Sequence, residues 1–167
     1  MSRLFALAAL GAVAAGPLLA AEPESCGVVR FADVGWTDIT ATTAVAGTVL
    51  RALGYETSVD LLSVPVTYQS LARGDIDLFL GNWMPTMEAD IAPYRDAGTV
   101  DTVRVNLTGA KYTLAVSNSL AEQGLTEFSE IAEFAEPLDG KIYGIESGND
   151  GNRIILEMIE ADAFGLD

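Results

Sequence analysis

The sequence contains no histidine and only one cysteine among its 167 residues. Without histidine, catalysis that uses imidazole as acid or base is excluded, and so is a histidine-ligated metal site. One cysteine cannot build a thiolate zinc site, and the sequence has no Gly-Lys-Ser/Thr phosphate-binding motif. These absences remove several classes of enzyme and metalloprotein. We predict no catalytic residue, no metal site and no cofactor.

Basic residues are scarce as well. Nine lysines and arginines stand against 24 aspartates and glutamates, for a formal net charge of −15 at pH 7. A chain of this charge repels phosphate backbones, so nucleic acid is excluded as a partner. A negative surface instead raises the local concentration of cations, including small organic ones. The charge is therefore compatible with a cationic ligand.

The first 21 residues differ from the rest of the chain. Arg3 gives a positive start, residues 4–19 are almost wholly apolar, and Ala20 and Ala21 precede a polar stretch. This pattern is typical of a secretory signal peptide, which predicts an exported protein. The alternative is an uncleaved membrane anchor, because the apolar run approaches the length of a membrane span. Gly11, Gly16 and Pro17 interrupt the run and favour the signal peptide.

The single cysteine, Cys26, lies shortly after the predicted cleavage site, beyond residues 22–25. An unpaired cysteine in an exported protein indicates a missing disulfide partner. The sequence also stops at Asp167, immediately behind a helical pattern. Together these features predict an incomplete protein in which the partner of Cys26 is absent. The alternative is a free thiol in a small complete domain.

The chain after residue 27 alternates between strand and helix patterns. Strands are predicted over residues 28–32, 55–62 and 76–80, and helices over residues 39–53 and 67–72. Thr37 or Asp38 would cap the first helix, and Gly54 and Gly74 would end the two helices. Strands that alternate with helices imply a parallel sheet with right-handed crossovers. We therefore predict an α/β fold.

The pattern restarts after a polar crossing. A helix over residues 88–97, interrupted by Pro93, precedes a polar stretch over residues 98–109. Beyond it, residues 111–116 and 141–145 are predicted strands, whereas residues 128–134 and 152–163 have helical spacing. We therefore divide the chain into a first α/β lobe over residues 22–105 and a partial second α/β lobe over residues 106–167.

Both tryptophans follow the end of a predicted strand. Trp36 comes after the first strand and Trp83 after the third, where Gly81 would end the strand and Pro85 would begin a helix. In a parallel sheet these carboxyl ends lie along one edge, where ligands bind. We expect Trp36 and Trp83 to line one cleft. The alternative for either is a packing aromatic.

The remaining candidates are aromatic or acidic. A quaternary ammonium has no N–H to donate, but it is attracted to the negative faces of aromatic rings. Trp36, Trp83 and Tyr112 supply such rings, and Asp38 would add a counter-charge. Asn149, just before the last helix, suits a neutral hydroxyl or a helix cap. The residues thus predict a quaternary ammonium site.

Two pairs of carboxylates support a different class of protein. Asp75 and Asp77 lie on one face of a predicted strand, and Glu88 and Asp90 begin the following helix. Such pairs can bind hard cations or act as the acid and base of a hydrolytic reaction. No spacing ties either pair to the predicted cleft, so an exported hydrolase is the weaker hypothesis.

Four ordered motifs resemble a known family. They are Val34-Gly35-Trp36-Thr37-Asp38, Phe79-Leu80-Gly81-Asn82-Trp83-Met84-Pro85, Ala110-Lys111-Tyr112 and Gly144-Ile145-Glu146-Ser147-Gly148-Asn149-Asp150-Gly151. Together they resemble the periplasmic choline-binding proteins of ABC importers, within the glycine betaine/choline substrate-binding group. The resemblance implies a type II periplasmic binding protein fold, with two lobes that each have a central, mostly parallel sheet. It also implies a monomer that delivers its ligand to a permease in the inner membrane.

The resemblance also assigns roles to the candidate residues. It implies that Trp36, Trp83 and Tyr112 are walls of an aromatic box, that Asp38 faces the cation, and that Asn149 contacts the choline hydroxyl. In the family a later tryptophan completes the box and a later cysteine pairs with the counterpart of Cys26. The present sequence ends before either, so the second lobe is expected to be incomplete. Glycine betaine or proline betaine binding and a non-functional truncated fragment are the alternatives.

Overall fold

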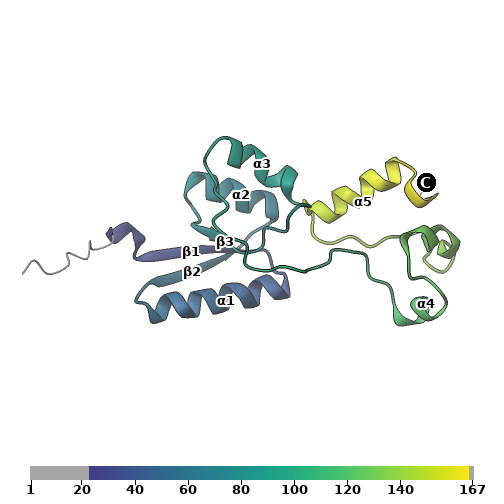
Figure 1. Cartoon of the computed structure of the whole chain (residues 1–167), viewed down its shortest axis with the longest axis horizontal. Helices are drawn as coiled ribbons and strands as arrows, with labels where there is room; N and C mark the ends of the chain where they lie inside the picture. The colour runs from purple at the N-terminus through teal and green to yellow at the C-terminus, as the bar shows by residue number, and fades with distance from the viewer. Residues whose placement is uncertain (1–22, 166–167) are drawn as a thin grey trace, which may run out of the picture.

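The computed structural model describes residues 23–165, so the predicted signal peptide over residues 1–21 lies outside the described residues. The elements follow in chain order: η1 (Glu24–Cys26), β1 (Val28–Asp33), α1 (Thr37–Ala52), β2 (Glu56–Leu61), α2 (Val64–Arg73), β3 (Leu78–Phe79), α3 (Glu88–Asp96), α4 (Asn118–Glu122), η2 (Phe128–Phe134), α5 (Asp150–Glu160) and η3 (Ala163–Gly165). Residues 23–100 form a sheet unit, and residues 101–165 form a C-terminal segment that extends from it (Figure 1).

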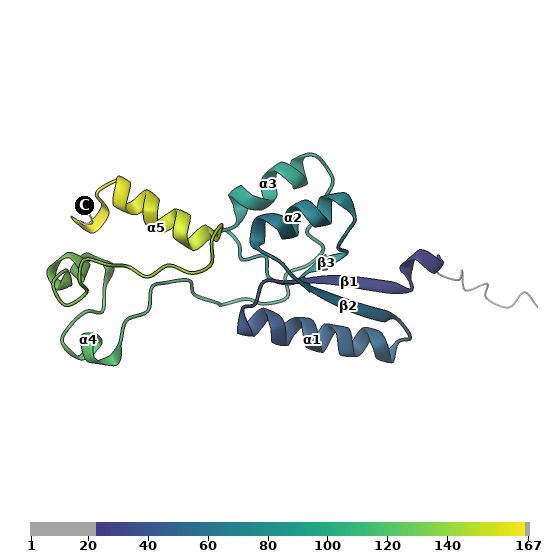
Figure 2. The same cartoon turned by 180° about the vertical axis from the view of Figure 1, so that it is seen from behind.

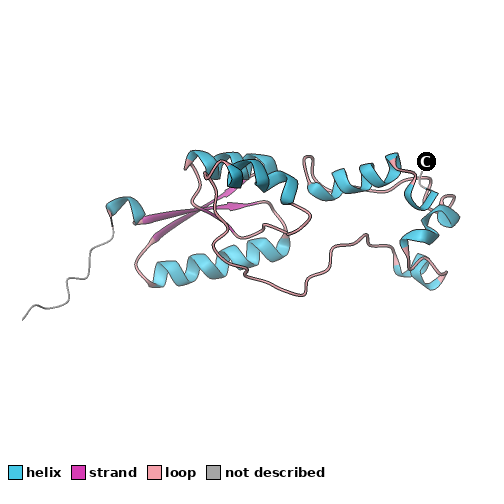
Figure 3. Ribbon diagram, turned by 45° about the horizontal axis from the view of Figure 1, so that its top comes forward, coloured by secondary structure: helices cyan, strands magenta, loops and turns pink. Residues whose placement is uncertain are grey.

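The sheet unit is built on three parallel strands in the order β2, β1, β3. Figure 1 shows α1 on one face of this sheet and α2 with α3 on the other. Figure 3 shows the same layers with the strands between the helices. The predicted α/β fold with a parallel sheet is confirmed here. Because β1 is central, its carboxyl end is enclosed by the elements on both faces.

The core lies between the sheet and the helices α2 and α3. Five fully or nearly buried side chains form it, namely Val34, Val64, Tyr68, Met87 and Ile91. Half-buried residues pack around them, including Trp36 and Trp83. The two tryptophans thus share one core with the carboxyl ends of β1 and β3, where the sequence analysis placed them.

The two helices α2 and α3 differ from the predicted ones at a proline. Helix α2 begins at Val64 rather than at residue 67, because Pro65 in the first turn needs no hydrogen-bonded N–H. Helix α3 runs through Pro93 to Asp96, although an interruption was predicted. The lost hydrogen bond is offset by packing, since Ile91 is buried and Tyr94 stacks on Tyr68. As predicted, Gly74 ends α2 in the left-handed conformation.

The turn after β3 also departs from the prediction. Pro85 does not begin a helix; it lies in a turn closed by hydrogen bonds from Met87 N to Trp83 O and from Glu88 N to Pro85 O, and α3 starts at Glu88. Gly81 is needed for close packing, because a Cβ there would lie 2.8 Å from the Phe79 ring. Trp83 is therefore held on a turn between strand and helix.

No strand follows Phe79 in the part of the chain that the structure describes, so the strands predicted over residues 111–116 and 141–145 are wrong. A strand requires a neighbouring strand that pairs its alternate N–H and C=O groups. The backbone of Ile145 instead forms its hydrogen bonds with the Asn152 side chain. Ile145 N donates to Asn152 Oδ1, and Asn152 Nδ2 donates to Ile145 O. Figure 2 shows these stretches as extended loops between the sheet unit and α4, η2 and α5.

Three of the four carboxylates in the two predicted pairs, Asp77, Glu88 and Asp90, are engaged in ion pairs. Asp77 accepts three hydrogen bonds from Arg30, from its backbone N, its Nε and its second terminal nitrogen. Glu88 pairs with Arg95, and Asp90 pairs with Arg153. No group of three metal-ligating side chains occurs within residues 23–165. These three carboxylates therefore have basic partners within the fold.

The Arg30–Asp77 pair predicts an acid-dependent loss of stability. The hydrogen bonds from Arg30 hold the pKa of Asp77 below its ordinary value. A carboxyl whose pKa is lower in the folded state stabilises the fold above its unfolded pKa of about 3.9, and this contribution disappears as the pH falls through the lower folded value. Both side chains are more than a third exposed, so the effect is small.

We expect Asp77→Asn to lower the urea midpoint of unfolding slightly at pH 7 and to have no effect near pH 2. Asp75→Asn, which changes an exposed neighbouring carboxylate, is the matched control and should lower the midpoint less, because Asp75 acts on Arg30 through its charge, the smallest of the effects on the Arg30 pKa, and makes no hydrogen bond to it. An equal effect of Asp77→Asn at the two pH values would contradict the ionic origin of this contribution.

Candidate functional site

Trp36 is positioned by a turn at the end of β1. Asp33 is 7% exposed, and its Oδ1 accepts a hydrogen bond from Gly35 N at 2.8 Å while its Oδ2 accepts one from Thr40 Oγ1 at 2.7 Å. Gly35 has a φ of 82°, which favours glycine. Trp36 then caps α1 through its backbone. The role of Asp33 was missed, although an aspartate two residues before a glycine is a typical turn signal.

Trp83 is fixed by the core beneath it. Tyr68 is 1% exposed, and its hydroxyl donates to Asn82 Oδ1 at 2.7 Å, next to Trp83 in the chain. Burial raises the pKa of Tyr68, with smaller contributions from Asp90 and Asp150, so its hydroxyl stays protonated and able to donate. The backbone N of Trp83 donates to Met87 Sδ at 3.1 Å. The core thus determines where the indole lies.

Tyr112 comes from the C-terminal segment and meets Trp83. The two ring centroids lie 5.9 Å apart with an interplanar angle of 41°. The Tyr112 hydroxyl donates to Asn149 Oδ1 at 3.1 Å. This approach depends on Gly151, because a Cβ at that position would lie 2.2 Å from the Tyr112 hydroxyl oxygen. Burial raises the pKa of Tyr112, and the charges of Asp150 and Glu146 raise it further.

Asn149 is the buried centre of this arrangement, with 2% exposure. Its Oδ1 also accepts from Gly151 N at 2.7 Å, so the side chain caps the start of α5. Its Nδ2 donates to Glu146 Oε1 at 2.8 Å. Asn149 was predicted to contact a ligand hydroxyl or to cap a helix, and the cap is present.

Glu146 joins the two ends of the candidate site, a role that the sequence analysis missed. Its Oε1 accepts from Trp36 Nε1 at 2.9 Å as well as from Asn149 Nδ2. A continuous chain of hydrogen bonds therefore runs from Trp36 through Glu146 and Asn149 to Tyr112, whose ring faces Trp83. The structure thus links four of the five predicted ligand-binding residues, with Glu146 between Trp36 and Asn149, and with Trp83 joined by its ring contact with Tyr112.

Asp38 is the predicted residue that the structure does not link to the others. It lies in the first turn of α1, two residues after Trp36, and its side chain is exposed. Its backbone carbonyl accepts from Thr42 Oγ1. The carboxylate makes no hydrogen bond or ion pair with residues 23–165. Cys26, the disulfide candidate, is exposed and forms no disulfide in the same range.

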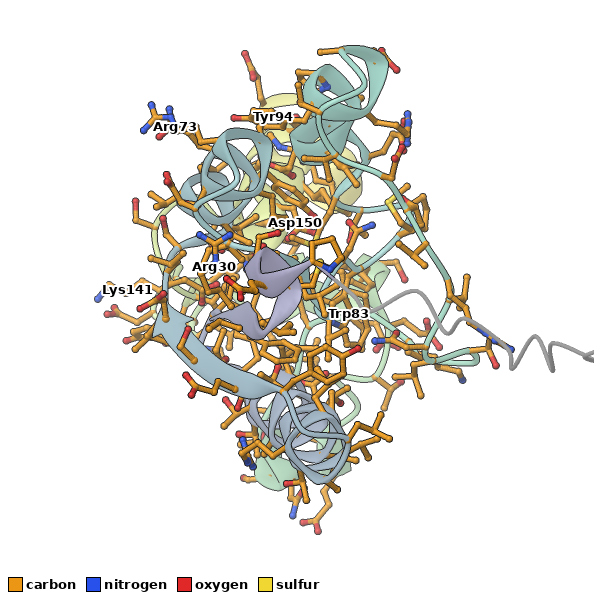
Figure 4. All side chains as sticks on the ribbon, turned by 90° about the vertical axis from the view of Figure 1, so that its left-hand side faces the viewer. Arg30, Arg73, Trp83, Tyr94, Lys141 and Asp150 are labelled. Atoms are coloured by element: carbon orange, nitrogen blue, oxygen red, sulfur yellow. The ribbon has the colours of Figure 1, made fainter. Side chains whose placement is uncertain are left out.

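A second set of contacts connects α5 to the sheet unit. Arg153 donates to Thr86 O at 3.3 Å and to Asp90 Oδ2 at 3.4 Å. Burial raises the pKa of Asp90, and the charge of Arg153 partly opposes this rise. Asp150 is 1% exposed, and its Oδ2 has no hydrogen-bond partner among the described residues. In the end-on view of Figure 4, Arg73 and Lys141 point outward, whereas Trp83 and Asp150 lie within the outline of the molecule.

An apolar hollow of about 940 Å³ lies in the C-terminal segment. Aliphatic side chains of α5, such as Ile155 and Met158, line it together with Ile131 and Leu138, and Tyr112 is the only predicted site residue at its wall. The lining also includes the aromatic residues Phe128 and Tyr143, but it is otherwise mostly aliphatic, and Lys141 places a positive charge there that repels a cation. The candidate site is therefore the aromatic and polar chain at the sheet edge, which the hollow adjoins at Tyr112.

Comparison with known proteins places the chain among solute-binding proteins. Residues 27–167 match the family described as the substrate binding domain of the ABC-type glycine betaine transport system. An uncharacterized protein, ORF1, of Chromohalobacter salexigens is 50% identical over 148 residues, which cover 89% of this chain and 95% of that protein. Within residues 23–165, no helix has the length and hydropathy of a membrane span.

Two solved structures are more similar still. An ABC-transporter choline binding protein in complex with choline is 68% identical with a TM-score of 0.82, and covers 87% of this chain. The unliganded semi-closed form is 67% identical over 86% of this chain, with a TM-score of 0.75. The chain spans about half the length of these solved chains, 50% in each case. The predicted likeness to a periplasmic binding protein fold is confirmed, with only part of that fold present. On the family match and these identities, the chain belongs to the family of substrate-binding domains of ABC-type glycine betaine transport systems.

Proposed function

We propose that this chain captures choline for an ABC importer, with Trp36, Trp83 and Tyr112 as walls around the trimethylammonium group. The observation that carries the proposal is the Trp83–Tyr112 ring pair, which is linked to Trp36 through Glu146 and Asn149. Rings from distant parts of the chain are thus joined in one series of contacts that passes through Glu146 and Asn149. Each desolvated ring contact with a cation is worth about 0.5 to 2 kcal/mol.

The identity to a choline-binding protein supports the same ligand. At 68% identity, and with a TM-score of 0.82 to the complex with choline, the described part of the chain is folded like its counterpart in that complex. In the proposal Asn149 contacts the choline hydroxyl, and Asp38 adds negative charge at the rim of the site. Asp38 is exposed, so we assign it attraction at longer range.

The proposal extends to the setting of the protein. Residues 1–21 would direct export to the periplasm, residues 22–105 and 106–167 would form a lobe and part of a second lobe, and Cys26 would pair with a cysteine outside this sequence. The loaded protein, as a monomer, would deliver choline to a permease in the inner membrane. Family membership supports the transport role, in which the protein binds its substrate without converting it.

Choline titration tests the proposal directly. We expect choline to produce a saturable change in tryptophan fluorescence, because both tryptophans of the chain belong to the proposed site. Several ring contacts bring the expected dissociation constant toward the micromolar range, about 8 kcal/mol, after the cost of immobilising the ligand. The measurement is a fluorescence titration, repeated by calorimetry. No saturable change up to millimolar choline would contradict the proposed function.

Glycine betaine is the second candidate ligand, because the matching family is described by glycine betaine transport. It shares the trimethylammonium group and carries a carboxylate in place of the hydroxyl. We rank it below choline since the neighbouring charges of Glu146 and Asp150 disfavour a carboxylate. Competition between the two ligands decides the order, and tighter binding of glycine betaine would reverse it.

A further inference from the structure

The carboxylate of Glu146 has one oxygen engaged and one free. Its Oε1 accepts from Trp36 Nε1 and from Asn149 Nδ2, at 2.9 and 2.8 Å. Its Oε2 takes no hydrogen bond from any residue within the described range. A carboxylate oxygen only accepts hydrogen bonds. The free oxygen therefore suits a ligand group that donates a proton in a hydrogen bond and opposes a group that carries negative charge.

Asn149 has one amide proton that is available to a ligand hydroxyl. Its Oδ1 is occupied by Gly151 N and the Tyr112 hydroxyl, and one of its two amide protons is directed to Glu146. An amide nitrogen has two protons, so one remains to donate. A ligand hydroxyl can donate to Glu146 Oε2 and accept from Asn149 Nδ2. A ligand carboxylate has no proton to offer to Glu146.

The charges around the site reinforce this difference. Glu146 and Asp150 both act on Tyr112, whose pKa they raise. Of the nearby cationic groups, Arg153 is engaged with Thr86 O, Asp90 and Glu157. Lys111 precedes Tyr112 in the chain but is exposed. Among residues 23–165, the site therefore has a negative balance that no adjacent buried cation cancels.

We propose that Glu146 determines ligand specificity, by accepting a hydrogen bond from the hydroxyl of choline and repelling the carboxylate of glycine betaine. This proposal rests on the proposed function and adds the basis of selectivity to it. It differs from the sequence-based expectation that Asp38 supplies the opposing charge, since the structure ties Glu146, and not Asp38, to Trp36 and Asn149.

The test is Glu146→Gln, because glutamine keeps a carbonyl oxygen that accepts from Trp36 and Asn149 and loses only the charge. Dissociation constants are measured by calorimetry for choline, glycine betaine and tetramethylammonium. Tetramethylammonium has neither hydroxyl nor carboxylate, so ratios to its affinity cancel the attraction of the common ammonium group. We expect the affinity of glycine betaine relative to tetramethylammonium to rise about tenfold, and that of choline to fall.

Two controls separate a specific charge from other effects. Glu133→Gln makes the same change at an exposed residue of η2 and should leave every ratio unaltered. Raising the salt concentration should relax the discrimination against glycine betaine in the wild-type chain and not in Glu146→Gln, because salt screens the charge of an exposed carboxylate. If the variant folds poorly, the wild-type series still tests the proposal, because discrimination against glycine betaine that salt does not relax would contradict a role for the exposed Glu146 carboxylate.

The outcomes distinguish a failure of the Glu146 specificity role from a failure of the proposed function. If the wild-type chain binds none of the three ligands, the proposed function fails and the role of Glu146 fails with it. If the wild-type chain prefers choline and Glu146→Gln keeps the same ratios, choline binding stands and the specificity role is overturned. An equal shift in Glu133→Gln would assign the effect to net charge and would also overturn it.

Discussion

Replacing Trp83 by alanine is expected to weaken choline binding by about 100-fold, close to 2.7 kcal/mol. The indole lies against Tyr112 and packs on the core, so alanine removes one wall of the proposed box and lets water reach the opposite wall. Loss of one fully desolvated anchor is typically this costly in a small site. Calorimetry measures the change, because the substitution also removes one of the two tryptophans that report binding by fluorescence.

Trp83→Phe is the matched control, since it keeps an aromatic face at the same position. We expect it to retain most of the affinity, with a loss below about tenfold, because phenylalanine has the weaker quadrupole of the two rings. Thermal unfolding of both variants shows whether the turn after β3 persists. Equal binding by the wild-type chain and a folded Trp83→Ala variant would exclude Trp83 from the site.

Replacing Tyr68 by alanine is expected to lower the free energy of unfolding by about 3 to 5 kcal/mol. Tyr68 is 1% exposed, meets Phe79 edge to face with ring centroids 5.9 Å apart, and stacks on Tyr94 at 6.2 Å. Its removal leaves a cavity where α2, α3 and β3 meet. Since small domains are stable by only about 5 to 15 kcal/mol, this loss is a large part of the total. Urea unfolding at neutral pH measures it.

Tyr68→Phe separates the ring from its hydroxyl. It keeps the packing and removes the donor to Asn82 Oδ1, at an expected cost of about 1 to 2 kcal/mol. Asn82 precedes Trp83, so we also expect a modest decrease in choline affinity in this variant. If Tyr68→Phe destabilised the fold as much as Tyr68→Ala, the hydroxyl rather than the ring packing would dominate the role of Tyr68.

The sheet unit could be predicted closely because its determinants are local. Residues 28–32 and 55–62 correspond to β1 and β2, and Gly74 ends α2 as expected. Short runs of β-prone residues and terminal glycines act over a few positions, so they can be recognised in the chain. The strands predicted over residues 111–116 and 141–145 failed for the opposite reason: strand pattern alone does not supply the neighbouring strand that a ladder needs.

In the candidate site, too, the features set by local sequence were predicted and a contact between distant segments was missed. Trp36, Trp83 and Tyr112 were predicted from ring chemistry, and the first two from their position after strands. Glu146 was missed because its contact with Trp36 joins residues 110 positions apart. Asp38 looked equally suitable by composition, and only the direction of the first turn of α1 leaves it exposed and away from the polar chain.

The sequence alone established an acidic α/β protein with aromatic residues at strand ends, because residue types, turns and periodicity are properties of neighbouring positions. The tertiary structure established which carboxylate links Trp36 to Asn149. Glu146 is bonded to Trp36 and Asn149 because α5 and the loop before it fold back against the sheet edge. A contact of this kind depends on the paths of two distant segments in space, and no local pattern in the chain encodes it.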